Sequence, residues 1–152
     1  MIFTPASVDE VRKALGTPLG PTDWLDIDQA RIDAFAEATG DHQWIHVDAE
    51  RAATGPFGRT IAHGFLTLSL IPMFSAQLFV LEFGTARLNY GLNRVRLPAP
   101  VPVGSRIRAV AEFCALTEVA AGQLLTTHYT IEVDGAAKPA CSAEMLTLVV
   151  TR

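Results

Sequence analysis

The sequence is poor in the residues that mark several large classes of protein. It has two cysteines, Cys114 and Cys141, which lie far apart and form no CxxC pair. It has 12 Lys and Arg residues against 16 Asp and Glu residues, and no basic stripe. We therefore expect no disulfide framework and no nucleic-acid-binding surface, because phosphate binding needs clustered positive charge. Both cysteines are expected to be reduced core residues of a cytoplasmic protein.

Common catalytic motifs are also missing. The chain contains no GxGxxG, Walker-type or GxSxG sequence, which removes nucleotide-dependent and serine-hydrolase functions. It has no HExxH either, so we expect no metal site. The N-terminus lacks a basic region followed by an apolar run, so no secretion signal is expected. At 152 residues the sequence predicts a single domain, residues 1–152, with a full hydrophobic core.

One long segment, Gly64 to Leu81, carries no charged residue, and its apolar residues cover every side of a helical wheel. Such a helix either spans a membrane or lies at the centre of a protein core. Pro72 in mid-segment, several neutral polar residues and the absence of flanking Lys/Arg clusters favour the core. We therefore predict a buried central helix, bent at Pro72, and no membrane association.

The N-terminal part alternates helix signals with turn signals. Ser7 and Glu10 form a capping box that starts a helix ending near Gly16. Thr17–Pro21 reads as a turn, and Trp24–Ile27 as a short strand. Asp28 is expected to cap a second helix that Gly40 stops. Residues 41–59 are predicted to be irregular, with one helical turn after Asp48.

Everything after Phe83 alternates like antiparallel strands. The expected inward-facing residues of four strands are Leu88, Tyr90, Leu92, Val95 and Leu97; Ile107, Ala109, Ala111, Phe113 and Ala115; Leu125, Thr127, Tyr129, Ile131 and Val133; and alternate residues of 140–150. A change of parity at Asn93-Arg94 indicates a β-bulge. The order of elements predicts an α+β domain in which a curved antiparallel sheet wraps one buried helix.

Three residues around the start of the central helix could carry out chemistry. Asp41 and His46 share one irregular segment, where a carboxylate and an imidazole could act as base and acid. Gly64 begins the predicted helix, so its free amide could stabilise a negatively charged oxygen. Each also has a structural explanation: Asp41 as a cap, His46 as a packing residue and Gly64 as a close helix–sheet contact. His63, beside Gly64, could orient the loop by hydrogen bonding.

Three stretches resemble the MaoC-like, (R)-specific (type 2) enoyl-CoA hydratase family. They are Phe35–His46 (FAEATGDHQWIH) with Ala52 beyond it, Ala62–Phe65 (AHGF) opening the apolar helix, and Asn93–Gly104 (NRVRLPAPVPVG). The resemblance covers nearly the whole chain after the first twenty residues. It implies a hot-dog fold, with the long helix as the sausage and the sheet as the bun. It also implies a homodimer in which the two sheets join edge to edge.

The resemblance implies reversible hydration of trans-2-enoyl-CoA to (R)-3-hydroxyacyl-CoA in fatty-acid metabolism. Asp41 and His46 would be the catalytic pair and the Gly64 amide would hold the thioester oxygen, with Gln43, His63 and Arg94 as substrate-binding residues. The family usually has Asn where this chain has Gln43 and Pro where it has Trp44, which puts the acyl length in question. No cofactor is implied, because coenzyme A is part of the substrate. A hot-dog acyl-CoA thioesterase and a non-catalytic acyl-CoA-binding dimer remain alternatives.

Overall fold

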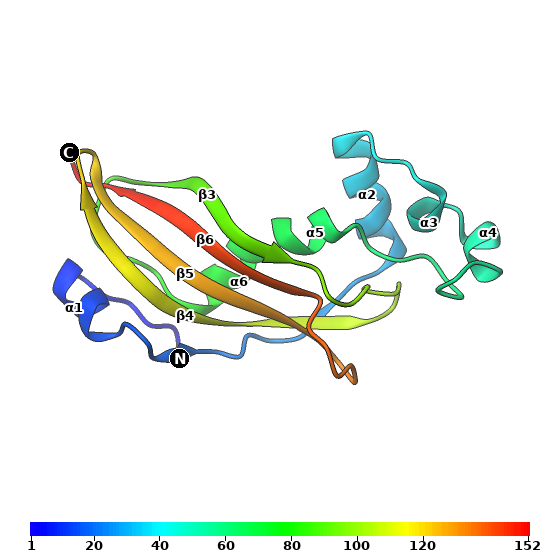
Figure 1. Ribbon diagram of the computed structural model, residues 1–152, viewed down its shortest axis with the longest axis horizontal. Helices are drawn as coiled ribbons and strands as arrows, with labels where there is room; N and C mark the ends of the chain where they lie inside the picture. The colour runs from blue at the N-terminus through cyan, green and yellow to red at the C-terminus, as the bar shows by residue number, and fades with distance from the viewer.

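A computed structural model describes all residues from 1 to 152 and shows one curved antiparallel sheet (Figure 1). The strands hydrogen-bond in the order β1, β4, β5, β6 and β3, and β2 also pairs with β4. Their bounds are Pro18–Leu19 for β1, Leu25–Asp26 for β2, Ala86–Arg96 for β3, Arg106–Val119 for β4, Gly122–Val133 for β5 and Cys141–Val150 for β6. The long strand β3 therefore forms an edge of the sheet.

The helices occupy three places around this sheet. Their bounds are Val8–Lys13 for α1, Gln29–Thr39 for α2, Trp44–Val47 for α3, Ala49–Ala53 for α4, Gly64–Ser69 for α5 and Ile71–Leu78 for α6. Figure 1 shows α6 in the hollow of the sheet with α5 beside it, α1 at one end, and α2, α3 and α4 together beyond the other end. The predicted α+β architecture is confirmed.

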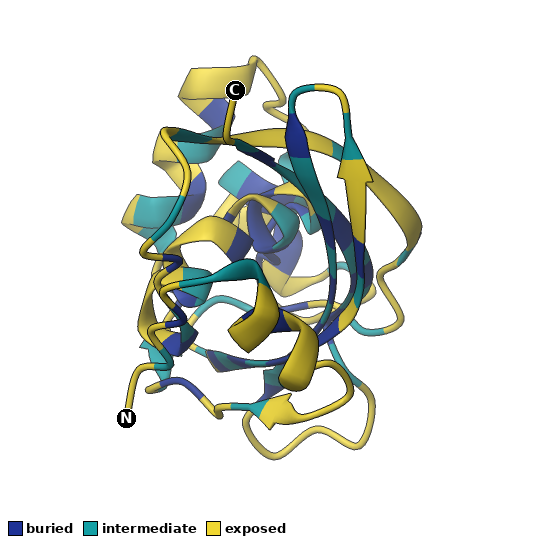
Figure 2. Ribbon diagram, turned by 90° about the vertical axis from the view of Figure 1, so that its left-hand side faces the viewer, coloured by how far each residue is buried: buried dark blue, intermediate teal, exposed yellow.

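The main core lies between α6 and the inner face of the sheet. Ile71, Phe74 and Leu78 of α6 belong to one buried cluster with Ile107 and Ile131 of the sheet. Figure 2 shows these buried segments at the centre of the molecule. Burying one such side chain stabilises the fold by about 1.5–3 kcal/mol. Packing of this kind fixes α6, and with it the position of the segment that leads into α5.

The predicted central helix is divided in two. Helix α5 ends at Ser69 and α6 starts at Ile71, with Pro72 in its first turn. Pro72 has no N–H for the carbonyl of Leu68, which explains the break. The expected burial on every side is wrong, because Phe65 and Met73 are exposed. No helix of the structure combines the length and hydrophobicity needed to cross a membrane.

The strands confirm most of the alternation and correct part of it. The bulge at Asn93-Arg94 is present: the pairing register of β3 and β6 shifts between Asn93 and Arg96, and Arg94 has φ of 52°. However, Leu88, Tyr90 and Leu92 are exposed on this edge strand, and the register of β3 and β6 also shifts between Asn89 and Gly91, which changes the parity of β3 at Tyr90. The expected inward position of Leu97 is also wrong, since its side chain is exposed.

An unexpected bulge also lies in β4. The register with β5 shifts between Phe113 and Ala115, so Leu116 rather than Ala115 is buried. The same shift leaves Cys114 exposed, which corrects the expectation that both cysteines lie in the core. Cys141 is buried as expected, and burial raises the pKa of its thiol to about 11.

The helix boundaries of the N-terminal half follow the capping residues. Ser7 accepts a hydrogen bond from the Glu10 amide, and Asp28 accepts one from the Arg31 amide. Gly40 ends α2 with φ of 77°, the left-handed conformation that glycine adopts without strain. Two details differ from expectation: part of the predicted turn pairs with β4 as β1, and α3 forms within the stretch predicted to be irregular.

Candidate active site

The segment between α2 and α5 folds back on itself and carries the predicted catalytic residues. The Ile61 amide donates a hydrogen bond to the Ile45 carbonyl over 3.0 Å, which joins the end of the segment to α3. The next amide, that of Ala62, donates to the Val101 carbonyl over 2.8 Å. The segment is thus held both to itself and to the loop after β3.

His46 lies on α3 and is buried. Its Nδ1 is 2.7 Å from the Ile61 carbonyl oxygen. A carbonyl can only accept, so Nδ1 carries the proton and Nε2 of the neutral ring keeps a free lone pair. The pKa of His46 is lowered from 6.5, first by burial and also by His63, while the Ile61 bond and Asp41 act in the opposite direction. His46 is therefore set up as a neutral base.

His63 lies directly against His46. The two imidazole rings stack with centroids 3.8 Å apart and an interplanar angle of 22°. Nε2 of His63 donates a hydrogen bond to the main-chain carbonyl of Asp41 over 2.9 Å. This bond is the loop-orienting contact expected for His63. Its Nδ1 is buried and has no hydrogen-bond partner.

Asp41 completes the group from the exposed side. One carboxylate oxygen of Asp41 and one ring nitrogen each of His46 and His63 lie within 4.8 Å of one another. The Asp41 side chain also accepts a hydrogen bond of 3.3 Å from the Gln43 amide. The turn-capping explanation and the catalytic one are thus compatible, because a carboxylate has several lone pairs and Asp41 stays open to water.

A carboxylate and two imidazoles are also residue types that bind transition metals. A metal bond requires each imidazole to direct an in-plane lone pair at the ion. The rings of His46 and His63 lie one above the other, nearly parallel, so a single ion cannot lie in both ring planes. The stacked arrangement fits proton transfer better than metal binding, and the expectation that no metal is used stays a prediction.

Gly64 is the first residue of α5, where the chain passes from the histidine pair into the helix. Amides of a first helical turn have no acceptor within the helix, so the Gly64 N–H is available to an oxygen. A Cβ at this position would lie 2.4 Å from Cδ1 of Leu97. The side chain of Leu97 therefore rests directly on Gly64, and a larger residue at this position would require the end of the Leu97 side chain to shift.

A cavity of about 360 Å³ opens beside these residues. His46 and Gly64 line it together with apolar side chains, among them Ile45, Phe57 and Leu97. Apolar walls with a few polar groups at one place are typical of small-molecule sites. The cavity thus combines a base, a free amide and an apolar lining. This combination suits a substrate that has a reactive carbonyl and a hydrocarbon chain.

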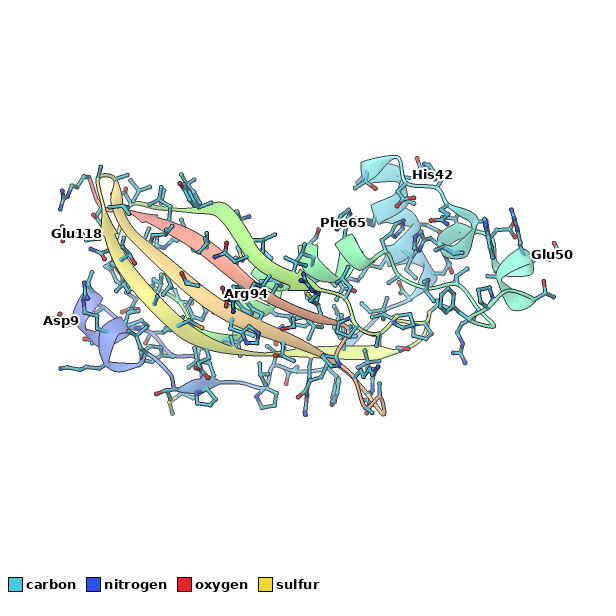
Figure 3. All side chains as sticks on the ribbon, viewed as in Figure 1. Asp9, His42, Glu50, Phe65, Arg94 and Glu118 are labelled. Carbon is cyan, nitrogen blue, oxygen red and sulfur yellow. The ribbon has the colours of Figure 1, made fainter.

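The other predicted binding residues are not gathered here. Figure 3 shows Arg94 over the middle of the sheet, whereas His42, next to Asp41, lies among the helices at one end. Gln43 is exposed and contacts Asp41 through its main-chain amide. Neither residue lines the cavity beside His46. Within one chain the structure brings together Asp41, His46 and His63, and the substrate-binding roles of Gln43 and Arg94 stay predictions.

Trp44, one of the two departures that put the acyl length in question, makes its contacts away from the cavity. Its ring packs under the guanidinium carbon of Arg51 at 4.3 Å and against Gly55. Trp44 does not line the cavity. The bulky residue that replaces proline therefore contacts α4 and the turn after it.

Sequence reasoning missed the residues that support the site from behind. Gln29, Thr60 and Ile61 contact His46 or each other through side-chain or main-chain hydrogen bonds. They are separated from His46 by up to 17 residues and carry no motif. The one available signal was polarity: Thr60 directly precedes an apolar stretch, and a buried threonine needs a partner.

Comparison with known proteins identifies the family of this chain. The family model described as MaoC like domain matches residues 10–134. The chain belongs to the MaoC-like dehydratase family. It is 51% identical over 141 residues to 3-hydroxyacyl-thioester dehydratase Z of Mycobacterium tuberculosis, covering 92% of this chain and 93% of that protein. Members of this family with the names dehydratase and hydratase are hydro-lyases, and this MaoC-like chain is an enzyme of that class.

Solved structures confirm the fold predicted from the resemblance. The (R)-hydratase of Aeromonas caviae superposes with a TM-score of 0.73 and 27% identity, covering 89% of this chain and 96% of that one. A protein of Archaeoglobus described as a monoamine oxidase regulatory protein superposes with a TM-score of 0.79 and 21% identity, covering 100% and 99%. This MaoC-like chain therefore has the hot-dog fold.

Proposed function

We propose that this chain catalyses the reversible hydration of a trans-2-enoyl thioester to the (R)-3-hydroxyacyl thioester. The observation that carries the proposal is the cluster of Asp41, His46 and His63, in which His46 also lines one apolar cavity together with Gly64. The names of the relatives, a 3-hydroxyacyl-thioester dehydratase and an (R)-hydratase, support both the reaction and its stereochemistry.

The proposed mechanism uses one water molecule between Asp41 and Nε2 of His46. As the water oxygen attacks the β-carbon, Asp41 takes one water proton, neutral His46 holds the water by accepting a hydrogen bond at Nε2, and Asp41 returns its proton to the α-carbon. The product gains H and OH across the double bond, so no redox step or cofactor is needed. Negative charge on the thioester oxygen is stabilised by the Gly64 N–H; losing one such donor typically costs about 3 kcal/mol of barrier.

The proposal includes a coenzyme A thioester as substrate and a place in fatty-acid metabolism. The apolar cavity beside His46 supports an acyl group, and the free state of Cys114 and Cys141 supports a cytoplasmic location.

We further propose that the active form is a homodimer joined through β3. Edge strands expose unpaired main-chain groups and are usually shielded. On this edge Leu88, Tyr90 and Leu92 are exposed, and Phe65 and Met73 are exposed on the adjoining helices. Figure 3 shows Phe65 on the outer side of α5. A second copy would cover these apolar side chains and continue the sheet.

The test is to incubate the purified protein with short and long trans-2-enoyl-CoAs and follow loss of the conjugated double bond. We expect loss of absorbance, an (R)-3-hydroxyacyl-CoA product and no free thiol. Release of free coenzyme A would instead indicate a thioesterase. Saturable binding without either product would indicate a non-catalytic acyl-CoA-binding protein.

A further inference from the structure

We propose that Gln29 is a positioning residue that holds His46 in place through its main chain. Gln29 belongs to α2, outside the segment that carries Asp41, His46 and Gly64; it does not line the cavity, and it contacts His46 through the main chain and not through the imidazole ring. The inference rests on the proposed hydratase function, because its effect is expected on the catalytic step.

The Gln29 side chain makes three hydrogen bonds. Its Nε2 donates to the His46 main-chain carbonyl and to Asp33 Oδ1, both over 2.8 Å. Its Oε1 accepts a hydrogen bond of 2.6 Å from the Thr60 hydroxyl. Both acceptors facing Nε2 are oxygens without hydrogens, so the amide orientation is fixed by its surroundings. Both N–H groups of the Gln29 amide therefore have an acceptor.

These bonds close a ring of contacts around His46. Thr60 is 1% exposed, and its neighbour Ile61 accepts the hydrogen bond from His46 Nδ1. The His46 ring is therefore held by Ile61, and its main chain is held through Gln29 to Thr60, the preceding residue. Two constraints from one short segment fix both the position of α3 and the direction of Nε2.

Only an amide fits this position. A donor is needed toward the His46 carbonyl and an acceptor toward the Thr60 hydroxyl. A glutamate would keep the acceptor but would face the His46 carbonyl and the Asp33 carboxylate with a negative oxygen. Since a displacement of about 1 Å can lower a catalytic rate about 10²-fold, the loss of either bond should appear mainly in kcat.

The experiment compares Gln29→Ala, Gln29→Glu, Thr60→Val and Thr60→Ser by kcat and KM for an enoyl-CoA that the wild-type protein hydrates. Gln29→Ala, Gln29→Glu and Thr60→Val should lower kcat about 10- to 100-fold with KM changed less than about threefold. Thr60→Ser keeps the hydroxyl group and should retain most of the wild-type kcat. Asp33→Ala removes only the exposed third bond and is the matched control, with kcat within about twofold of wild type.

Equal losses in Asp33→Ala and Gln29→Ala, or an unchanged kcat in Thr60→Val, would overturn the proposal. Should Gln29→Ala not fold, the Thr60→Val and Thr60→Ser pair decides alone. NMR of the His46 ring gives a readout without turnover: the Nδ1–H signal should shift or broaden in Thr60→Val and not in Asp33→Ala. An unchanged signal contradicts the positioning role, whereas an inactive wild-type protein with the expected shift contradicts only the hydratase function.

Discussion

The imidazole rings of His46 and His63 stack face to face with centroids 3.8 Å apart, and each donates a ring N–H to a main-chain carbonyl. His46 bonds Ile61, and His63 bonds Asp41. One ring is thus directed at the expected substrate water, while the other holds the main chain that bears the carboxylate.

This pair predicts unequal effects for two substitutions of His63. Gln can still donate to the Asp41 carbonyl, whereas Ala cannot, so His63→Ala should lower kcat about 10- to 100-fold and His63→Gln should lose less. Measuring kcat and KM of both variants checks this. Equal rates for Ala and Gln, close to wild type, would show that the bond to Asp41 does not position the carboxylate.

The pH dependence of activity should follow His46. Burial lowers the pKa of His46 below 6.5, and the proposed mechanism needs its neutral form. Activity should therefore persist as pH falls through 6.5 and decline only below that value. The pH profile of kcat/KM tests this, alongside NMR titration of the His46 ring. An NMR midpoint above 6.5 would contradict the assignment of His46 as a buried neutral base.

The free energy of unfolding should also decrease as pH falls below 6.5. In the unfolded chain the His46 pKa is ordinary, so below pH 6.5 the unfolded state binds more protons than the folded one. The contribution of His46 to the free energy of unfolding is fully present above that pH and decreases as pH falls toward the lowered pKa. Urea denaturation of wild type and His46→Gln, compared at pH 7.5 and pH 5.5, isolates this effect because the variant cannot titrate there.

The contact between Gly64 and Leu97 predicts a double-mutant result. Gly64→Ala puts a methyl group against Cδ1 of Leu97, so we expect lower stability and lower kcat/KM. Adding Leu97→Ala should restore the melting temperature but not the activity, because the methyl group still blocks close approach of a substrate carbonyl to the amide.

Full recovery of kcat/KM in the Gly64→Ala, Leu97→Ala pair would mean that substrate does not approach Gly64.

The exposed edge strand predicts the oligomeric state. Replacing Tyr90 with Lys places a charge among the apolar residues of β3, and we expect it to convert a dimer into a monomer. Leu15→Lys is the control, because Leu15 is also an exposed apolar residue but lies after α1, away from β3. Analytical ultracentrifugation measures the mass; a wild-type monomer, or a Tyr90→Lys dimer, contradicts the proposed interface.

Local signals allowed much of the fold to be predicted from sequence. The caps at Ser7, Asp28 and Gly40 act on main-chain groups a few residues away, so a short stretch of sequence is enough to predict them. The bulge at Asn93-Arg94 was visible because a change of parity moves every later side chain to the other face. Periodicity could not show that Leu88 and Tyr90 lie on an unpaired edge, because it does not specify which strands become neighbours.

Part of the candidate active site could also be predicted from the sequence. Asp41, His46 and Gly64 were found because their spacing matches a family motif, and His63 because it adjoins Gly64. Gln29 and Leu97 were not found, since they reach His46 and Gly64 only through the tertiary fold. Residues that support a site from distant parts of the chain leave no local pattern in one sequence.

The role of Asp41 is tested most directly by the turnover of Asp41→Asn. The change is nearly isosteric, Asp41 is exposed, and the Asn oxygen can still accept the Gln43 amide, so the melting temperature should match that of wild type. General acid–base catalysis typically raises a reaction rate about 10²- to 10⁴-fold. We therefore predict that Asp41→Asn lowers the rate of trans-2-enoyl-CoA hydration by at least about 10²-fold. A folded Asp41→Asn protein that hydrates the substrate at close to the wild-type rate would contradict the account.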